Sequence, residues 1–136
     1  MKAGDIWLAQ LDPAVGSEIQ KTRPCVVISP EDMNAHLRTV IVAPMTTGSR
    51  PARLRIALTF RGQQGLIVLD QIRTLDRVRL VKRLGALRAQ TLALTLQTLR
   101  NMFAMTCGCT RATRMLPDCE RCGRSLIDPW SFSTGR

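Results

Sequence analysis

The chain has 136 residues, enough for one compact domain with a hydrophobic core and a small appendage. Its 20 lysines and arginines against 10 acidic residues give a net charge of +10, which favours a polyanionic partner such as nucleic acid, with a merely biased surface as the alternative. No apolar run approaches the roughly 20 residues of a membrane span. The N-terminus reaches Asp5 before any apolar region and lacks the pattern of a secretory signal, so we expect a cytoplasmic protein with no membrane partner.

The first part of the chain is predicted to form short strands separated by turns. Turn-forming groups around Pro13, Pro30, Gly48 and Gly62 lie between apolar or alternating stretches. The expected strands are residues 5–10, 25–28, 39–43, 54–58 and 65–69. Short strands at this spacing predict a mainly β fold, a small barrel or a sandwich.

Residues 89–103 change to a helical period. Apolar residues recur at the spacing of one helix face, whereas Gln90, Gln97 and Arg100 are polar. The recurring apolar residues are Leu92, Leu96, Leu99 and Phe103. The pattern predicts an amphipathic helix that either lies on the sheet or closes a dimer. Leu94 widens the apolar face and leaves a contact with a partner open.

An unusually charged loop, Gly16–Pro24, lies between two apolar runs. Gly16 permits a tight turn. Pro24 fixes its own φ and favours an extended conformation at Arg23, so this arginine is expected where a strand begins. The next residue, Cys25, stands alone in an apolar run and is interpreted as a small buried hydrophobe.

Several catalytic schemes find no support in the sequence, and one remains. The single histidine, His36, has no evident partner, the carboxylates mostly stand singly, and there is no phosphate-binding glycine motif. Thr46 and Thr47 end an apolar run, so Arg23 and Thr46 at neighbouring strand ends could bracket a phosphate. RNA supplies its own nucleophile, the 2′-hydroxyl, so such a site needs only charge stabilisation and proton handling. The alternative is a surface ion pair between Arg23 and Glu18, with the two threonines capping a strand.

Residues 105–136 differ in composition and hold four of the five cysteines. Cys107, Cys109, Cys119 and Cys122 are compatible with a structural zinc site of four thiolates, in which the glycine after the last ligand permits close backbone approach. The first pair is spaced more tightly than is usual for structural zinc. A disordered extension, or a segment without a folded role, is the alternative.

An ordered set of motifs closely resembles the MazF/PemK toxins of type II toxin–antitoxin systems. The resemblance covers residues 2–104. Its motifs are Gly4–Trp7, Leu11–Pro13, Gly16–Glu18, Arg23–Val27, Val42–Thr46, Asp70–Asp76, Arg79–Leu80 and Leu84–Gly85. No single motif is decisive, but the ordered set is highly specific.

The resemblance implies a fold and an activity. The expected fold is a homodimeric SH3-like small β-barrel with a C-terminal helix over residues 1–104, with residues 105–136 as an appended extension. The expected activity is that of an endoribonuclease that cleaves single-stranded mRNA selectively, without a metal or other cofactor. Attack by the 2′-hydroxyl would leave a 2′,3′-cyclic phosphate and a 5′-hydroxyl.

The same resemblance implies roles for individual residues. Arg23 would clamp the phosphate and stabilise its charge, and Thr46 would donate to a phosphoryl oxygen or orient the nucleophile. Glu18 would position substrate or share in proton transfer. Residues implied to bind substrate are Ser17, Lys21, Thr47, Gln71 and Arg73. The amide of Gln71 suits either a base edge or a buried structural hydrogen bond.

The expected partners follow from the resemblance as well. An antitoxin with an acidic C-terminal segment would occupy the RNA groove and, together with the toxin, bind DNA. Residues 1–104 carry fifteen basic and seven acidic residues, a balance of +8 that suits both RNA and an acidic peptide. The alternatives on the same fold are a gyrase-targeting toxin and a non-catalytic binding or regulatory protein.

Overall fold

The computed structural model describes residues 1–104, 118–119 and 124–125. The chain divides into two compact units, Met1–Met102 and Phe103–Arg136. The elements, in chain order, are β1 (Asp5–Gln10), β2 (Thr22–Val27), α1 (Glu31–His36), β3 (Thr39–Thr46), β4 (Arg55–Phe60), β5 (Gln63–Val68), η1 (Leu69–Gln71), β6 (Arg73–Asp76), η2 (Arg77–Arg79), β7 (Leu80–Ala86), α2 (Ala89–Phe103), β8 (Asp118–Cys119) and β9 (Arg124–Ser125).

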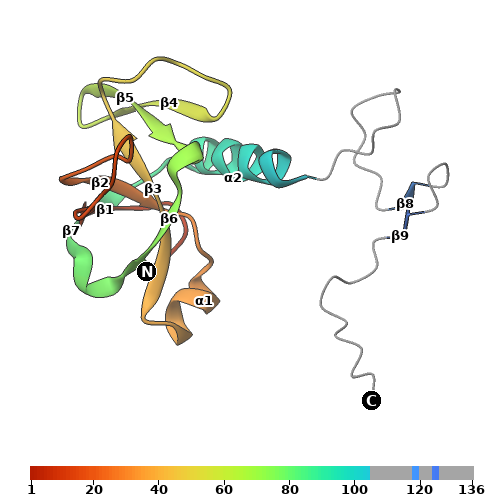
Figure 1. Ribbon diagram of the computed structural model, residues 1–136, viewed down its shortest axis with the longest axis horizontal. Helices are drawn as coiled ribbons and strands as arrows, with labels where there is room; N and C mark the ends of the chain where they lie inside the picture. The colour runs from red at the N-terminus through yellow and green to blue at the C-terminus, as the bar shows by residue number, and fades with distance from the viewer. Residues whose placement is uncertain (105–117, 120–123, 126–136) are drawn as a thin grey trace. The chain divides into compact units, whose positions relative to one another are not determined.

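Seven strands form one antiparallel sheet in the order β4-β5-β3-β2-β1-β7, with β6 also paired to β3 (Figure 1). Strand β3 organises the sheet because it changes partner along its length. Val42 pairs with Val27 of β2 on one edge and with Arg73 of β6 on the other. At its end, Met45 pairs instead with Ile67 of β5. The sheet can therefore curl towards a barrel rather than lie flat.

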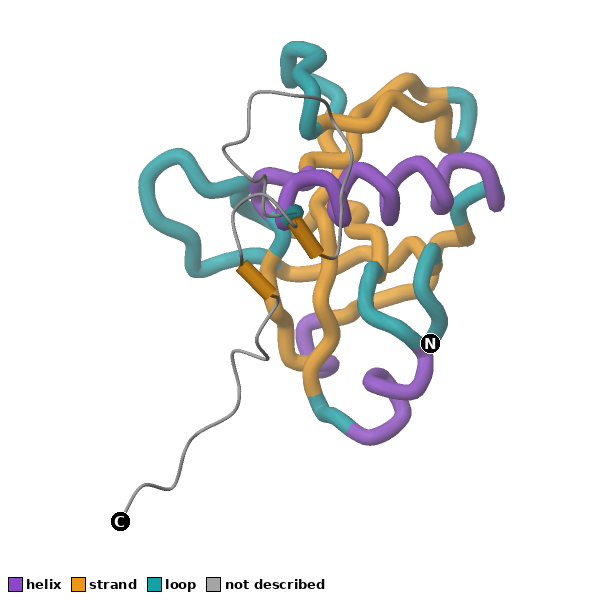
Figure 2. Tube along the Cα trace, turned by 90° about the vertical axis from the view of Figure 1, so that its right-hand side faces the viewer, coloured by secondary structure: helices purple, strands orange, loops and turns teal. Residues whose placement is uncertain are grey.

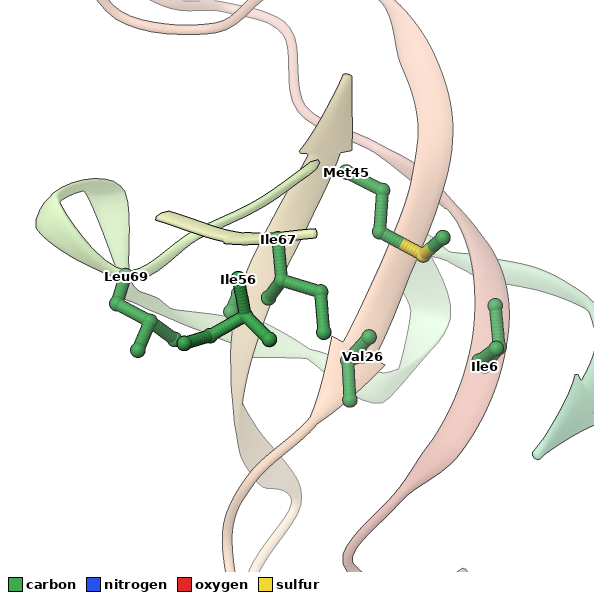
Figure 3. Packing of buried hydrophobic residues seen from close by; sticks show 7 residues of the cluster. Ile6, Val26, Met45, Ile56, Ile67 and Leu69 are labelled. Carbon is green, nitrogen blue, oxygen red and sulfur yellow. The ribbon is translucent and has the colours of Figure 1, made fainter. Parts of the chain in front are cut away.

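Alternate side chains of the central strands fill two clusters on opposite faces. One cluster consists of Ile6, Val26, Ala43, Met45, Ile56, Ile67 and Leu69 (Figure 3). The other consists of Ala9, Leu11, Cys25, Val27, Val40, Val42 and Leu75. Cys25 is buried as expected, and burial raises the pKa of its thiol to about 12, so it remains protonated and unreactive at neutral pH.

Helix α2 has the bounds that the leucine period predicts, and it runs across one side of the strands (Figure 2). Leu99 packs against the first cluster, and a Leu92 methyl lies so close to Gly4 that a Cβ there would be 3.0 Å from it. Leu94 is 53% exposed, so part of the apolar face stays outside the core. Among the described residues, no helix is long and apolar enough to cross a membrane.

The five expected strands are all present; β1 has the expected bounds, and the bounds of the other four are shifted. Strand β2 begins at Thr22, before the apolar run, because Arg23 and Pro24 pair with Ala9 and Leu8 of β1. Among the described elements, those not expected from the sequence are α1, η1, β6, η2, β7, β8 and β9. The central residues of β7, Val81 to Arg83, are exposed on both faces, so the strand lacks the alternation that would identify it.

Candidate active site

A pocket of about 170 Å³ lies where β2, β3 and the β4–β5 hairpin meet. Arg23, near the start of β2, and Thr46, at the end of β3, both line it. Strand pairing explains why they meet. Cys25 lies opposite Pro44, and the same register continued by two residues sets Arg23 opposite Thr46. The structure thus brings together two residues that the sequence places on separate strands.

The Arg23 guanidinium is held by the backbone and carries an unneutralised charge. Its Nε donates to the Gln20 carbonyl at 2.9 Å, and the side chain is half-buried. Among the described residues, no carboxylate lies within ion-pair distance of Arg23; Glu18 pairs with Arg73 instead. The alternative of an Arg23–Glu18 surface pair is therefore wrong for this structure. A fixed, uncompensated guanidinium suits an anionic ligand.

Thr46 keeps most of its hydrogen-bonding capacity. Its Oγ1 accepts from the Gly48 N–H at 3.4 Å, which is long for a hydrogen bond and uses only an acceptor site. The hydroxyl can therefore still donate. Thr47, which is exposed, also lines the pocket. Gly65 of β5 makes the close strand approach possible, because a Cβ at that position would lie 3.1 Å from the Thr46 carbonyl oxygen.

The β1–β2 loop, residues 11–21, is fastened by two side chains from the η1–β6 segment. The Gln71 amide accepts from the Ile19 N–H at 2.7 Å and donates to the Ser17 carbonyl at 3.3 Å. Arg73 donates to the Leu11 carbonyl at 3.0 Å and reaches Glu18 Oε2 at 3.5 Å. Gln71 and Arg73, both expected to bind substrate, therefore use their polar groups in hydrogen bonds with the β1–β2 loop.

The β3–β4 loop, which carries Thr47, is held by Arg55 of β4, and Arg55 in turn contacts Asp70 of η1. Arg55 contacts the Ser49 hydroxyl and donates to the Arg50 carbonyl at 3.3 Å. The same guanidinium faces both carboxylate oxygens of Asp70 at 3.5 Å. Gln71 and Arg73 thus contact the β1–β2 loop directly, whereas Asp70 is connected to the β3–β4 loop only through Arg55.

Glu18 lies outside the lining of the pocket and is 54% exposed. A tight turn, in which the Glu18 N–H donates to the Val15 carbonyl at 3.2 Å, places Gly16 at a φ of 59°. The Val15 N–H in turn donates to Glu18 Oε2 at 3.0 Å. This backbone hydrogen bond, with the Arg73 guanidinium as a smaller cause, holds the pKa of the Glu18 carboxyl below its usual value despite weak desolvation. Glu18 is thus ionised at neutral pH.

Ser17 and Lys21 contribute to the loop through their backbones. The Ser17 carbonyl accepts from Gln71, and the Lys21 N–H donates to Asp12 Oδ1 at 3.0 Å. Both side chains are exposed, and neither lines the pocket. Lys21 has a φ of 70°, an uncommon value for a residue with a side chain, and the loop contacts hold it there.

The rest of the pocket wall comes from residues that the sequence did not identify as site residues. Leu58 and Phe60 of β4 and Gln63 to Gly65 of β5 line it together with Met45. The sequence pattern places Gln63 and Gln64 in the turn around Gly62, before the strand expected at residues 65–69. The turn is in fact Arg61–Gly62, where both residues have positive φ. The glycine at the second position of Arg61–Gly62 is typical of a two-residue hairpin turn and could have located this turn in the sequence.

The described part of the chain contains no group of three or more histidine, cysteine or acidic residues that could hold a metal ion. Of the four tail cysteines, Cys107, Cys109 and Cys122 lie outside the described residues, and only the backbone of Cys119 is described. The zinc site therefore stays a prediction.

Sequence comparison relates the chain to named endoribonucleases. The family described as PemK-like, MazF-like toxin of type II toxin-antitoxin system matches residues 2–103. The chain is 39% identical over 81 residues to the endoribonuclease PemK of Escherichia coli, covering 56% of this chain and 61% of PemK. It is 37% identical over 90 residues to the endoribonuclease MazF of Staphylococcus epidermidis, covering 62% of this chain and 75% of that relative.

Structural comparison agrees. The crystal structure of MazF from Deinococcus radiodurans matches with a TM-score of 0.69 and 26% identity, covering 77% of this chain and 97% of that one. The expected fold, mainly β with a C-terminal helix as in MazF toxins, is thus confirmed. Because the family match extends over most of the sequence, the chain belongs to the PemK-like, MazF-like toxins of type II toxin–antitoxin systems.

Proposed function

We propose that this toxin is an endoribonuclease that cleaves single-stranded RNA at the pocket shared by Arg23 and Thr46. The observation that carries the proposal is the pairing of an unneutralised guanidinium with a hydroxyl donor at adjoining strand ends. These are the groups that a phosphodiester in its transition state requires. The naming of two relatives as endoribonucleases supports the same reaction.

The reaction is an internal transfer of the phosphoryl group. The substrate's 2′-oxygen forms a bond to phosphorus as the bond to the 5′-oxygen breaks, which leaves a 2′,3′-cyclic phosphate and a 5′-hydroxyl. Arg23 neutralises the charge that grows on the phosphoryl oxygens, and Thr46 donates a hydrogen bond to one of them. An arginine is too weak an acid to exchange protons readily near neutral pH, so its role is electrostatic. The chemistry requires no metal ion.

Proton transfer falls to the β1–β2 loop or to water. Among the described residues, no histidine, aspartate or glutamate lines the pocket. Glu18 is ionised and can accept the proton of the 2′-hydroxyl, but it must first leave its contact with Arg73. The departing 5′-oxygen takes up a proton from water, which gives the 5′-hydroxyl. Ser17, Lys21 and Thr47 contact the RNA from the two flanking loops. Gln71 and Arg73 act as positioning residues that set where the loop lies, rather than as direct ligands of RNA.

The partners follow from the toxin family. The antitoxin competes with RNA for the same basic groove through an acidic segment, and the two proteins act in the cytoplasm, where mRNA is found. Two toxin chains associate as a homodimer, and the exposed Leu94 of α2 suits such a contact.

The extension is a separate proposal. Residues 1–104 form the toxin domain, and residues 105–136 bind one structural zinc ion through Cys107, Cys109, Cys119 and Cys122. Four thiolates leave no open coordination position, so this zinc takes no part in catalysis. Equal zinc content in the full chain and in a chain ending at Ala104 would contradict the assignment.

A cleavage assay with end analysis tests the proposed function. The full chain is incubated with a long single-stranded RNA in EDTA, and the termini of the products are determined. We expect discrete cuts with 2′,3′-cyclic phosphate and 5′-hydroxyl ends, which disappear in Arg23→Ala. Intact RNA would overturn the proposal and would favour the gyrase-targeting or non-catalytic alternative.

A further inference from the structure

The β4–β5 hairpin presents one of its faces to the pocket. Phe60 lies directly opposite Gln63 and Leu58 opposite Gly65, so these residues share a face of the hairpin. It is the same face as the paired Ile56 and Ile67, which belong to the buried core. Phe60 and Gln63 are thus the outermost pair of the core face, at the turn end of the hairpin.

Two features hold this end of the pocket in place. The Arg61 guanidinium donates to the Leu84 carbonyl of β7 at 2.8 Å and lies over the Phe60 ring, 5.5 Å from its centre. A Cβ on Gly85 would lie 3.3 Å from Phe60 Cε2, so the ring edge also rests against β7. Phe60 is therefore a fixed apolar wall rather than a loose surface side chain.

The chemistry of the pocket changes from one end to the other. Arg23 and Thr46 offer a cation and a hydroxyl, whereas Phe60 and Leu58 offer apolar surface and Gln63 an exposed amide with two donors and an acceptor. A phosphate suits the first end. An aromatic ring beside an amide suits a nucleobase, which proteins recognise in single-stranded RNA by stacking and by hydrogen bonds to base edges.

We infer that the Phe60–Gln63 end of the pocket is a nucleobase subsite, in which Gln63 selects the base adjacent to the phosphate held by Arg23 and Thr46. The inference rests on the proposed ribonuclease function and deepens it, because it assigns sequence selectivity to a side chain. Gln64 follows Gln63 but pairs with Thr59, so its side chain belongs to the other face of the hairpin. Although Gln64 also borders the pocket, it contributes less to base selection.

The test is a measurement of base preference. The unaltered full chain and four variants are incubated with RNAs randomised around one cleavage site. The variants are Gln63→Leu, Gln63→Glu, Gln64→Leu and the control Gln90→Leu, whose site lies on α2 away from the pocket. The relative kcat/KM for each base is then read from the sequenced product ends. Leucine keeps the approximate size of glutamine without its amide, and glutamate replaces its donors with an acceptor.

We expect Gln63→Leu to flatten the preference at one position beside the cut by about 5- to 100-fold, the discrimination typical of a side chain bonded to a base edge. Gln63→Glu changes which base is preferred there, Gln64→Leu has a smaller effect, and Gln90→Leu has none. An unchanged preference in both Gln63 variants, or a larger effect of Gln64→Leu, would overturn the inference. Absence of cleavage by the unaltered chain would instead overturn the proposed function. Melting curves of the variants that match that of the unaltered chain exclude misfolding.

Discussion

Two arginines of this toxin, Arg23 and Arg73, occupy contrasting environments. Arg23 lies in a pocket built by strand pairing and has no carboxylate partner among the described residues. Arg73 is committed to the Leu11 carbonyl and to the Glu18 carboxylate, and with Gln71 it fastens a loop. The sequence alone marks both as residues that meet the substrate. Their contacts distinguish them: the charge of Arg23 is available to a ligand, whereas that of Arg73 is already paired with Glu18.

The two regions also differ in what holds them together. The pocket rests on backbone pairing and on the buried cluster that includes Met45, so its geometry resists the loss of one side chain. The loop depends on a few polar contacts that are partly exposed, each worth about 1 kcal/mol. Substitutions in the pocket should therefore affect the chemical step. Gln71 and Arg73, here called the clamp, hold the β1–β2 loop, so their substitution should affect loop position and substrate affinity.

The largest effect is expected at Arg23. Arg23→Ala removes the charge that faces the phosphate, and kcat for RNA cleavage should fall by about 10²- to 10³-fold, as for loss of one group that stabilises transition-state charge. Single-turnover cleavage measures this, with Arg23→Lys as a variant that keeps charge but not geometry. A kcat near that of the unaltered chain in a folded Arg23→Ala would remove Arg23 from the site.

Thr46 should follow with a smaller loss. Thr46→Ala deletes a hydrogen bond to a charged group, which corresponds to roughly a 10- to 100-fold decrease in kcat. Thr46→Ser keeps the hydroxyl and should retain most of the activity. Equal rates for the alanine and serine variants of Thr46 would contradict a hydrogen-bonding role.

The clamp is expected to respond differently. Gln71→Leu and Arg73→Ala should raise KM several-fold with a smaller change in kcat, and should speed tryptic cleavage after Lys21, because each freed loop contact is worth about 1 kcal/mol. Arg73→Lys should restore part of the protection. A loss confined to kcat, with no change in proteolysis, would contradict a positioning role and would indicate that Gln71 and Arg73 contact the substrate directly.

The smallest expected effect is on the titration of Glu18. Its pKa is lowered in the folded state, so its contribution to loop closure is fully present above the ordinary pKa of about 4.3 and is lost as pH falls through the lower folded value. Carbon NMR of the carboxyl should find a midpoint below 4.3. In Arg73→Ala the midpoint should rise only in part, since the Val15 N–H is the larger cause. A midpoint at or above the ordinary value would disprove the clamp around Glu18.

The sequence was sufficient for features that depend on local pattern. The period of leucines predicted the bounds of α2, and Pro24 correctly indicated that Arg23 lies where a strand begins. The pairing of Glu18 with Arg73 joins residues far apart in the sequence, so no local pattern could indicate it. The same holds for the hydrogen bonds of the Gln71 amide with Ile19 and Ser17, which also join residues far apart in the sequence.

The pocket wall was missed for a related reason. Gln63 and Gln64 are polar residues beside a glycine, a composition that favours a turn, yet both belong to β5. The hairpin turn at Arg61–Gly62 decides which of them shares a face with Phe60. Because a shift of one residue in register exchanges the two faces of a strand, side-chain direction at such a turn depends on pairing that the sequence does not display.

The central claim is that Arg23 and Thr46 act on one phosphate, and a double-mutant cycle tests it most directly. Single-turnover cleavage rates are measured for the unaltered chain, Arg23→Lys, Thr46→Ala and the double variant. If both residues stabilise the same transition-state charge, the loss in the double variant is smaller than the product of the two single losses. Losses that multiply would mean that the two strand ends act independently and would contradict a shared site.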